Sequence, residues 1–180
     1  MKIAAIVLAA VGLVVVFFWL TGPSPAQRAK TAEAAKSLRM AVLSRELFKS
    51  QPATAPTEVR AVVHDLGIGQ GTATLVAFAD GSTSLYLIPG GGFIGAGAHE
   101  AVKQAAARFR EEAGRVSRSF APLTDFPLLT GSQSAFYVVT DSATYGSGVV
   151  DTGDLLKGGQ DLSELARLAQ AVITQIRRSK

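Results

Sequence analysis

The hydrophobic pattern separates an apolar N-terminal block from a remainder with strand and helix periodicities. Ile3 to Leu20 is an unbroken run of 18 uncharged residues that ends in a cluster of large side chains, including Trp19. A helix needs roughly 20 apolar residues to cross a bilayer, and tryptophan favours the membrane interface. The pattern therefore predicts one transmembrane signal-anchor helix over residues 1–21, with the membrane bound through residues 3–20.

A cleaved signal peptide is the alternative interpretation of this block. Lys2 supplies a positive start, and Ser24-Pro25-Ala26 resembles a small-residue cleavage site, which would release a secreted domain near Ala26. However, the apolar run exceeds the usual 7 to 15 residues of a signal peptide. Ser24, Pro25 and Gln27 also have the spacing of a helix-capping box. We therefore favour an uncleaved anchor.

The charges that flank the apolar block predict its orientation. Arg28, Lys30, Lys36 and Arg39 follow it, whereas only Lys2 and the amino terminus precede it. Positively charged flanks favour the cytoplasm. We expect a single-pass membrane protein whose domain faces the cytoplasm. The opposite orientation, with a periplasmic or other extracytoplasmic domain, is the alternative.

Residues 22–56 are expected to form a juxtamembrane helix and a linker. Between Ala26 and Ser50, leucine and valine recur at helical spacing at Leu38, Val42 or Leu43, and Leu47. This stripe is expected to pack on the following domain; self-association through it, giving a homo-oligomer, is the alternative. Two prolines at positions 52 and 56 end the helix.

Residues 57–180 are predicted to form an α+β globular domain that begins with three strands. These strands are Val59–Leu66, Thr72–Ala79 and Ser82–Ile88. Asp80-Gly81 is a strong two-residue hairpin signal because both residues tolerate positive φ. Both faces of the second and third strands are apolar, so we expect the sheet to be covered on both sides, by helices or by a partner.

The rest of the domain predicts two helices and two further strands. Ala98 to Gly114 is an amphipathic helix, and residues 115–129 are expected to be irregular. Ser134–Thr140 and Thr144–Val150 form a second hairpin, and a capping box at Asp161-Leu162-Ser163-Glu164 opens the last helix. The predicted fold class is α+β, an antiparallel sheet of about five strands with packed helices, preceded by one transmembrane helix.

A glycine-rich segment between the third strand and the following helix is the main candidate binding site. Residues 90–95 match the G-x-G-x-x-G fingerprint of dinucleotide-binding proteins. The preceding strand belongs to a hairpin, and no acidic residue follows about 20 positions later to hold a ribose. A packing corner, or anion capture at the helix N-terminus, fits better. The candidate ligand-binding residues are Gly90, Gly91, Gly92, Gly95, Gly97 and His99.

Composition disfavours most other chemistry. The 18 Lys and Arg residues against 14 Asp and Glu give a net charge of +4 that is dispersed along the chain, so no nucleic acid is expected as a partner. Cysteine is absent, which removes thiolate nucleophiles and disulfides. His64-Asp65 and His99-Glu100 lie far apart in sequence. We expect no catalytic residue, no metal and no cofactor, and therefore no enzyme.

Four segments resemble a family of small bacterial proteins of uncharacterised function. The resemblance covers roughly residues 57 to 178 and is most specific from Gly-Thr-Ala-Thr-Leu to Gly-Gly-Gly. Members of the family lack the apolar start and look cytosolic, which agrees with the orientation above. The element order is also similar to that of profilin-like, roadblock and longin-type domains, which serve mostly as docking modules for small GTPases and membrane machinery. The segments are 65–67, 71–77, 80–87 and 90–95.

Together these features predict a membrane-anchored, non-enzymatic interaction or scaffolding module with a protein partner of unknown identity. The alternative is a small-ligand or anion sensor that uses the glycine-rich segment.

Overall fold

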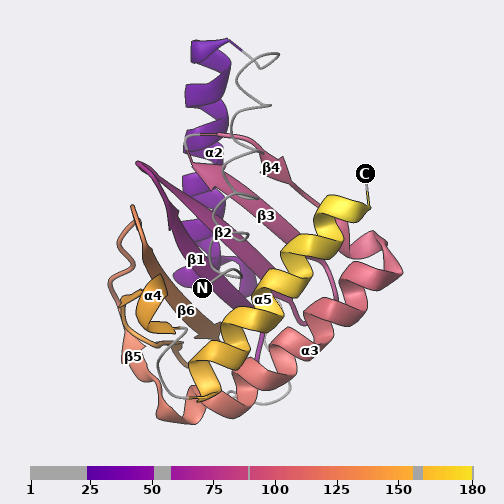
Figure 1. Ribbon diagram of the computed structural model, residues 1–180, viewed down its shortest axis with the longest axis vertical. Coiled ribbons are helices and arrows are strands. Elements are labelled where there is room, and N and C mark those ends of the chain that lie inside the picture. Colours follow the sequence, from indigo (N-terminus) through magenta and orange to yellow (C-terminus); the bar gives the residue numbers. More distant parts are fainter. Residues whose placement is uncertain (1–23, 51–57, 89, 156–159, 180) are drawn as a thin grey trace.

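An antiparallel meander of three strands forms the middle of the sheet. A computed structural model describes residues 24–50, 58–88, 90–155 and 160–179 of the chain (Figure 1). In it, β1 (Ala61–Ile68) pairs with β2 (Gly71–Phe78), which pairs with β3 (Thr83–Ile88). Gly81 has a φ of 89° at the turn between β2 and β3, which explains the glycine there. The hairpin predicted at Asp80-Gly81 is confirmed.

The sheet has eight strands, so the expectation of about five was wrong. Its order is β4-β3-β2-β1-β6-β7-β5, and β8 also pairs with β6. The added strands are short because glycine and proline interrupt them. Two of them, β4 (Gly92–Phe93) and β5 (Ala121–Leu123), were not predicted. The third arises because the predicted strand at 144–150 divides into β7 (Thr144–Gly146) and β8 (Val150–Asp151). Both of these strands pair with β6 (Gln133–Val139).

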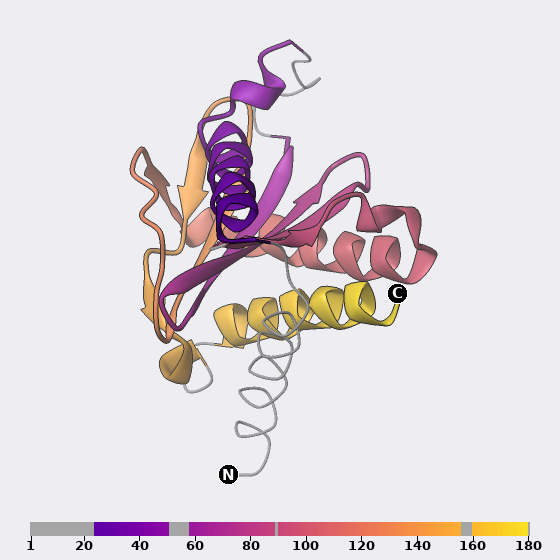
Figure 2. The same cartoon turned by 90° about the horizontal axis from the view of Figure 1, so that it is seen from above.

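Helices cover both faces of the sheet, as the apolar pattern predicts. α3 (Glu100–Val116) and α5 (Gln160–Arg178) lie side by side on one face, and α2 (Pro25–Leu43) lies on the other (Figures 1 and 2). Short helical segments complete the chain. They are η1 (Glu46–Phe48), η2 (Ala96–Ala98), η3 (Ser117–Ser119) and α4 (Thr152–Leu155).

The strand alternation divides the core into two clusters. Beneath α3 and α5, one face of the sheet contributes Leu75 and Leu85, which meet Phe109 of α3 and Leu165 of α5. Beneath α2, the other face contributes residues at the alternate positions. These residues, with the helix side chains that cover them, include Val42, Leu43, Val63, Val76, Tyr86 and Tyr137. Each face is therefore sealed by a helical layer.

The start of α2 matches the capping box predicted at Ser24. The Ser24 hydroxyl accepts a hydrogen bond from the Gln27 amide at 3.3 Å, and Pro25 is the first helical residue. The last helix differs from the prediction: α5 begins at Gln160, so Asp161 lies inside its first turn instead of capping it. The Asp161 carboxylate instead accepts a hydrogen bond from Arg115 of α3, which joins the two helices.

The predicted transmembrane helix lies outside the described residues. Among the residues that the structure does describe, no helix is both long enough and apolar enough to cross a bilayer.

Candidate functional site

The glycine-rich segment forms a corner that leads from β3 through β4 and η2 into α3. Gly90, Gly91 and Gly92 have φ angles of 138°, 105° and 141°, a region that L-residues with side chains rarely adopt. A Cβ at Gly92 would collide with the Leu85 carbonyl of β3, and one at Gly97 with the Gly81 carbonyl. The corner therefore depends on glycine for both its turn and its close backbone approach.

The helix that follows this corner begins with a negative charge. His99 is exposed at the N-cap of α3 and makes no side-chain capping bond there. Glu100 lies in the first turn, where its carboxylate accepts a hydrogen bond from Gln104 at 2.9 Å. A carboxylate at this position competes with a bound anion. The geometry thus gives the glycines a packing role, and ligand binding by the corner and His99 stays a prediction.

The two histidine-carboxylate pairs occupy different environments. His64 is 6% exposed in β1, whereas His99 is exposed at the start of α3. Asp65 points to the opposite face of the sheet from His64, since successive strand residues alternate. In the described ranges no group of three or more His, Cys, Asp and Glu side chains is placed to hold a metal ion.

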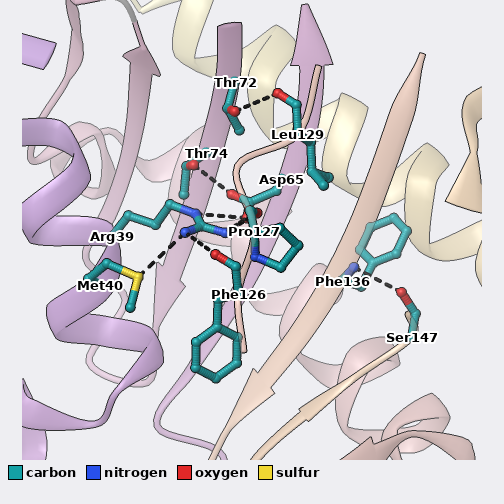
Figure 3. A network of polar contacts seen from close by, with 10 residues as sticks. All are labelled: Arg39, Met40, Asp65, Thr72, Thr74, Phe126, Pro127, Leu129, Phe136 and Ser147. Carbon is teal, nitrogen blue, oxygen red and sulfur yellow. Dashed lines mark hydrogen bonds and ion pairs between the residues drawn. The ribbon is translucent and has the colours of Figure 1, made fainter. Parts of the chain in front are cut away.

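The most extensive buried polar group lies between α2 and the sheet, around Arg39 and Asp65 (Figure 3). Arg39 is 1% exposed and Asp65 is fully buried. The Arg39 Nε and Nη2 atoms donate to Asp65 Oδ2 at 2.8 and 2.6 Å, and the Thr74 hydroxyl donates to Oδ1 at 2.5 Å. The carboxylate is therefore satisfied by partners from a helix and from the neighbouring strand.

The same guanidinium also holds the loop that precedes β6. Arg39 Nη1 donates to the Phe126 carbonyl at 3.0 Å, and Nη2 donates to the Pro127 carbonyl at 2.9 Å. Two residues later, the Leu129 carbonyl accepts a hydrogen bond from the Thr72 hydroxyl of β2 at 2.6 Å. Arg39 thus joins three parts of the chain: α2, β1 and the loop at 124–129.

Burial controls the ionisation of this network. Burial raises the pKa of the Asp65 carboxyl, and the Arg39 guanidinium and the Thr74 hydroxyl oppose that rise. Burial, with the nearby Asp65 charge, raises the pKa of Tyr137 to about 12. A buried ion pair is weak evidence for net stability, but removing one partner leaves a buried charge and costs several kcal/mol. The network therefore fixes the position of α2 more than it adds stability.

Sequence reasoning missed this network because it treated Arg39 only as a flanking charge. The inward positions of α2 are in fact Ala32, Ala35, Arg39 and Val42, at helical spacing. Leu47, which the predicted stripe included, is 46% exposed. Two features of the sequence could have predicted the pair. Arg39 falls at the same helical spacing as the small inward residues of α2, and Asp65 lies inside an otherwise apolar strand.

A second buried polar contact lies on the opposite face, between His64 and Ser134. The His64 Nε2 atom is 2.9 Å from the Ser134 hydroxyl, and its ring stacks on Phe136 with centroids 4.3 Å apart. The Nδ1 atom is buried without a hydrogen-bond partner, and burial lowers the pKa of His64 to about 3. Ser134 is fully buried, so this serine and histidine have no access to a substrate.

A shallow depression of about 320 Å³ lies at the end of α2. Its lining residues are Ser44, Arg45, Phe48, Lys49 and Asp141. Arg45 has a φ of 65°, the one positive value among the described residues other than glycine, and its guanidinium donates to the Asp141 and Ser142 carbonyls at 3.1 and 2.5 Å. The Arg45 side chain therefore holds the turn between β6 and β7 against the end of α2.

The fold and these sites define an antiparallel α+β domain with a polar junction between α2 and the sheet. No protein-family model, no curated protein and no solved structure matches the chain.

Proposed function

We propose that the chain is a membrane-anchored, non-enzymatic interaction module whose domain faces the cytoplasm and binds a protein partner. The observation that carries the proposal is the junction of α2 with the sheet. α2 begins at Pro25, five residues after the apolar run ends at Leu20. Because Arg39 ties α2 to Asp65 in the core, a helix spanning the bilayer would be followed by an element that belongs to the folded domain.

This arrangement suits a module that presents a surface at a fixed place near the membrane. A flexible stalk would let the domain move freely, whereas a docked helix limits the orientations that it can adopt. Next to the junction, Met40 and Leu128 are 42% and 43% exposed, and Arg39 contacts both the Met40 sulfur and the carbonyl of Pro127. Methionine adapts to irregular partner surfaces.

The burial and hydrogen bonding of the serine and histidine side chains support the proposed non-enzymatic role. His64 and Ser134, the buried histidine and serine that touch, are closed to solvent. The Ser147 hydroxyl accepts a hydrogen bond from the Phe136 amide at 3.0 Å and donates to the Gly148 carbonyl at 2.8 Å, so it serves the sheet. These contacts support a structural role for each group.

Membrane attachment is tested by comparing the full chain with a chain that starts at Thr21. After alkaline carbonate extraction, we expect the full chain to stay in the membrane pellet and the shortened chain to be soluble. A full chain that is released by carbonate would contradict the anchor. Fusing a reporter that is active only in the cytoplasm to Lys180 tests orientation, and an inactive but intact fusion would contradict a cytoplasmic domain.

The interaction role is tested by photo-crosslinking from the membrane-embedded full chain. A photoreactive residue at Met40 is expected to capture a reproducible protein partner, whereas the same residue at Val149, which is 46% exposed elsewhere on the domain, is the matched control. Equal crosslinking patterns from the two positions would contradict a specific partner surface beside α2.

A further inference from the structure

The glycine corner lies at the end of the domain where α2 begins. A Cβ at Gly90 would lie 2.8 Å from the Arg28 carbonyl, so the glycine corner touches the first turns of α2. β4 and the carboxyl end of α5 lie toward the same end (Figure 1). The first residue of α2, Pro25, lies at this end.

Ile94 is the most exposed of the large hydrophobic side chains in the described ranges. It follows β4 directly and is 77% exposed. Single exposed apolar residues are common on protein surfaces, so its exposure alone carries little meaning. Its position does, because Ile94 lies on the corner that contacts α2 and precedes Gly95, whose left-handed φ of 73° turns the chain away.

Several exposed residues toward this end are basic, and Glu100, which follows the corner at the start of α3, is an exposed acidic residue beside them. α5 ends with Arg177 and Arg178, both exposed, and no acidic residue occurs between Glu164 and the end of the chain. In α2, Lys30 is exposed, and the first turn contains no acidic residue. Cations at the carboxyl end of α5 also complement the helix dipole. The start of α2 and the end of α5, which lie on opposite faces of the sheet, therefore both present positive charge (Figures 1 and 2).

We propose that this end of the domain docks on the anionic surface of the bilayer, with Ile94 reaching the boundary between headgroups and acyl chains. The inference rests on the membrane anchor proposed above, since a tethered domain meets the bilayer at high effective concentration and weak contacts then suffice. Each lysine or arginine close to an anionic surface raises the docked population about fivefold. The anchor, Ile94 and the α5 arginines provide three separate contacts, which fix an orientation.

The test uses the full chain, which contains no cysteine, so single cysteines can be labelled specifically. An environment-sensitive fluorophore is attached at Ile94→Cys, or at Val149→Cys, which lies three residues before α4, as the control. Each protein is reconstituted into vesicles of phosphatidylcholine with about 30% phosphatidylglycerol. Flotation first shows whether the chain is in the vesicles, and lipid-borne and aqueous quenchers then locate each label.

We expect the Ile94 label to be quenched from the lipid and protected from aqueous iodide, and the Val149 label to behave in the opposite way. Arg177→Gln with Arg178→Gln should reduce the ratio of docked to undocked protein by roughly 25-fold, because two cations are lost at about fivefold each. If the chain floats but the Ile94 label is as accessible to iodide as the Val149 label, the docking proposal is wrong while the anchor stands. If the chain does not float, both proposals fail.

Discussion

Replacing Arg39 by methionine should separate the role of the buried ion pair from that of simple packing. Methionine retains much of the aliphatic volume of arginine but removes two hydrogen bonds to Asp65 and those to the Phe126 and Pro127 carbonyls. Only the Thr74 hydroxyl would remain on the Asp65 carboxylate. Breaking a buried pair by removing one partner costs about 3 to 5 kcal/mol, so Arg39→Met should lower the free energy of unfolding by that amount at pH 7.

The pH dependence of this loss has a predictable sign. Burial already raises the pKa of Asp65 above its ordinary value, and Arg39 opposes the rise. Without Arg39 the folded-state pKa rises further. A folded-state pKa above the unfolded one gives stability that is present at low pH and lost as pH rises. The difference in unfolding free energy between wild type and Arg39→Met should therefore shrink as pH falls from 7 toward 4.

Urea unfolding at several pH values measures both effects. Lys36→Met is the control on the same helix, because Lys36 forms a 3.6 Å ion pair with Glu33 at 43% side-chain exposure, and exposed pairs contribute less than about 1 kcal/mol. Combining Arg39→Met with Asp65→Leu should recover much of the loss, since apolar replacement of a whole buried pair is often neutral. A loss below about 1 kcal/mol for Arg39→Met, unchanged with pH, would show that the Arg39–Asp65 pair does not hold α2 on the sheet.

Two further predictions concern the opposite face and the glycine corner. Burial lowers the pKa of His64 from 6.5 in the unfolded chain to about 3 in the folded one. The neutral imidazole therefore stabilises the fold above pH 6.5, and this contribution is lost as the pH falls. Between pH 7 and pH 5, the free energy of unfolding should decrease by about 2 kcal/mol. Urea titrations should show this slope in wild type and in His99→Gln but not in His64→Gln, and an equal slope in both variants would disprove it. Gly92→Ala should destabilise the fold by several kcal/mol because its Cβ meets the Leu85 carbonyl, whereas Gly95→Ala, with open space around it, should cost only about 1 kcal/mol for its positive φ. Similar melting temperatures for the two glycine variants would contradict the packing role of the corner.

The sequence was most informative where one local rule dominates. Asp80-Gly81 correctly predicted the hairpin, although only Gly81 has the positive φ that was expected at both residues. Ser24 correctly predicted the start of α2. Phe109 and Leu165 mark the inward faces of α3 and α5, since both helices have an apolar stripe at regular spacing. For these elements, local pattern and tertiary packing agree.

Other elements depended on contacts that are distant in sequence. β4 and β5 contain Gly92 and Pro122, which argue against strands locally, and each forms only because a neighbouring strand offers it a partner. Arg39 and Asp65 are 26 residues apart, and neither signals burial without the other. Within the candidate site, the glycines of the corner could be recognised from the sequence, but their contact with α2 could not.

A module that presents its surface at a fixed place requires α2 to stay on the sheet when the chain is in a bilayer. Spin labels at Ser37→Cys on α2 and Gln70→Cys in the β1–β2 turn occupy exposed positions in a chain without other cysteines. Pulsed electron paramagnetic resonance on the reconstituted full chain should give one narrow distance distribution, which broadens in Arg39→Met. A broad distribution in the wild-type chain would contradict a docked α2, because the helix would then be a flexible stalk.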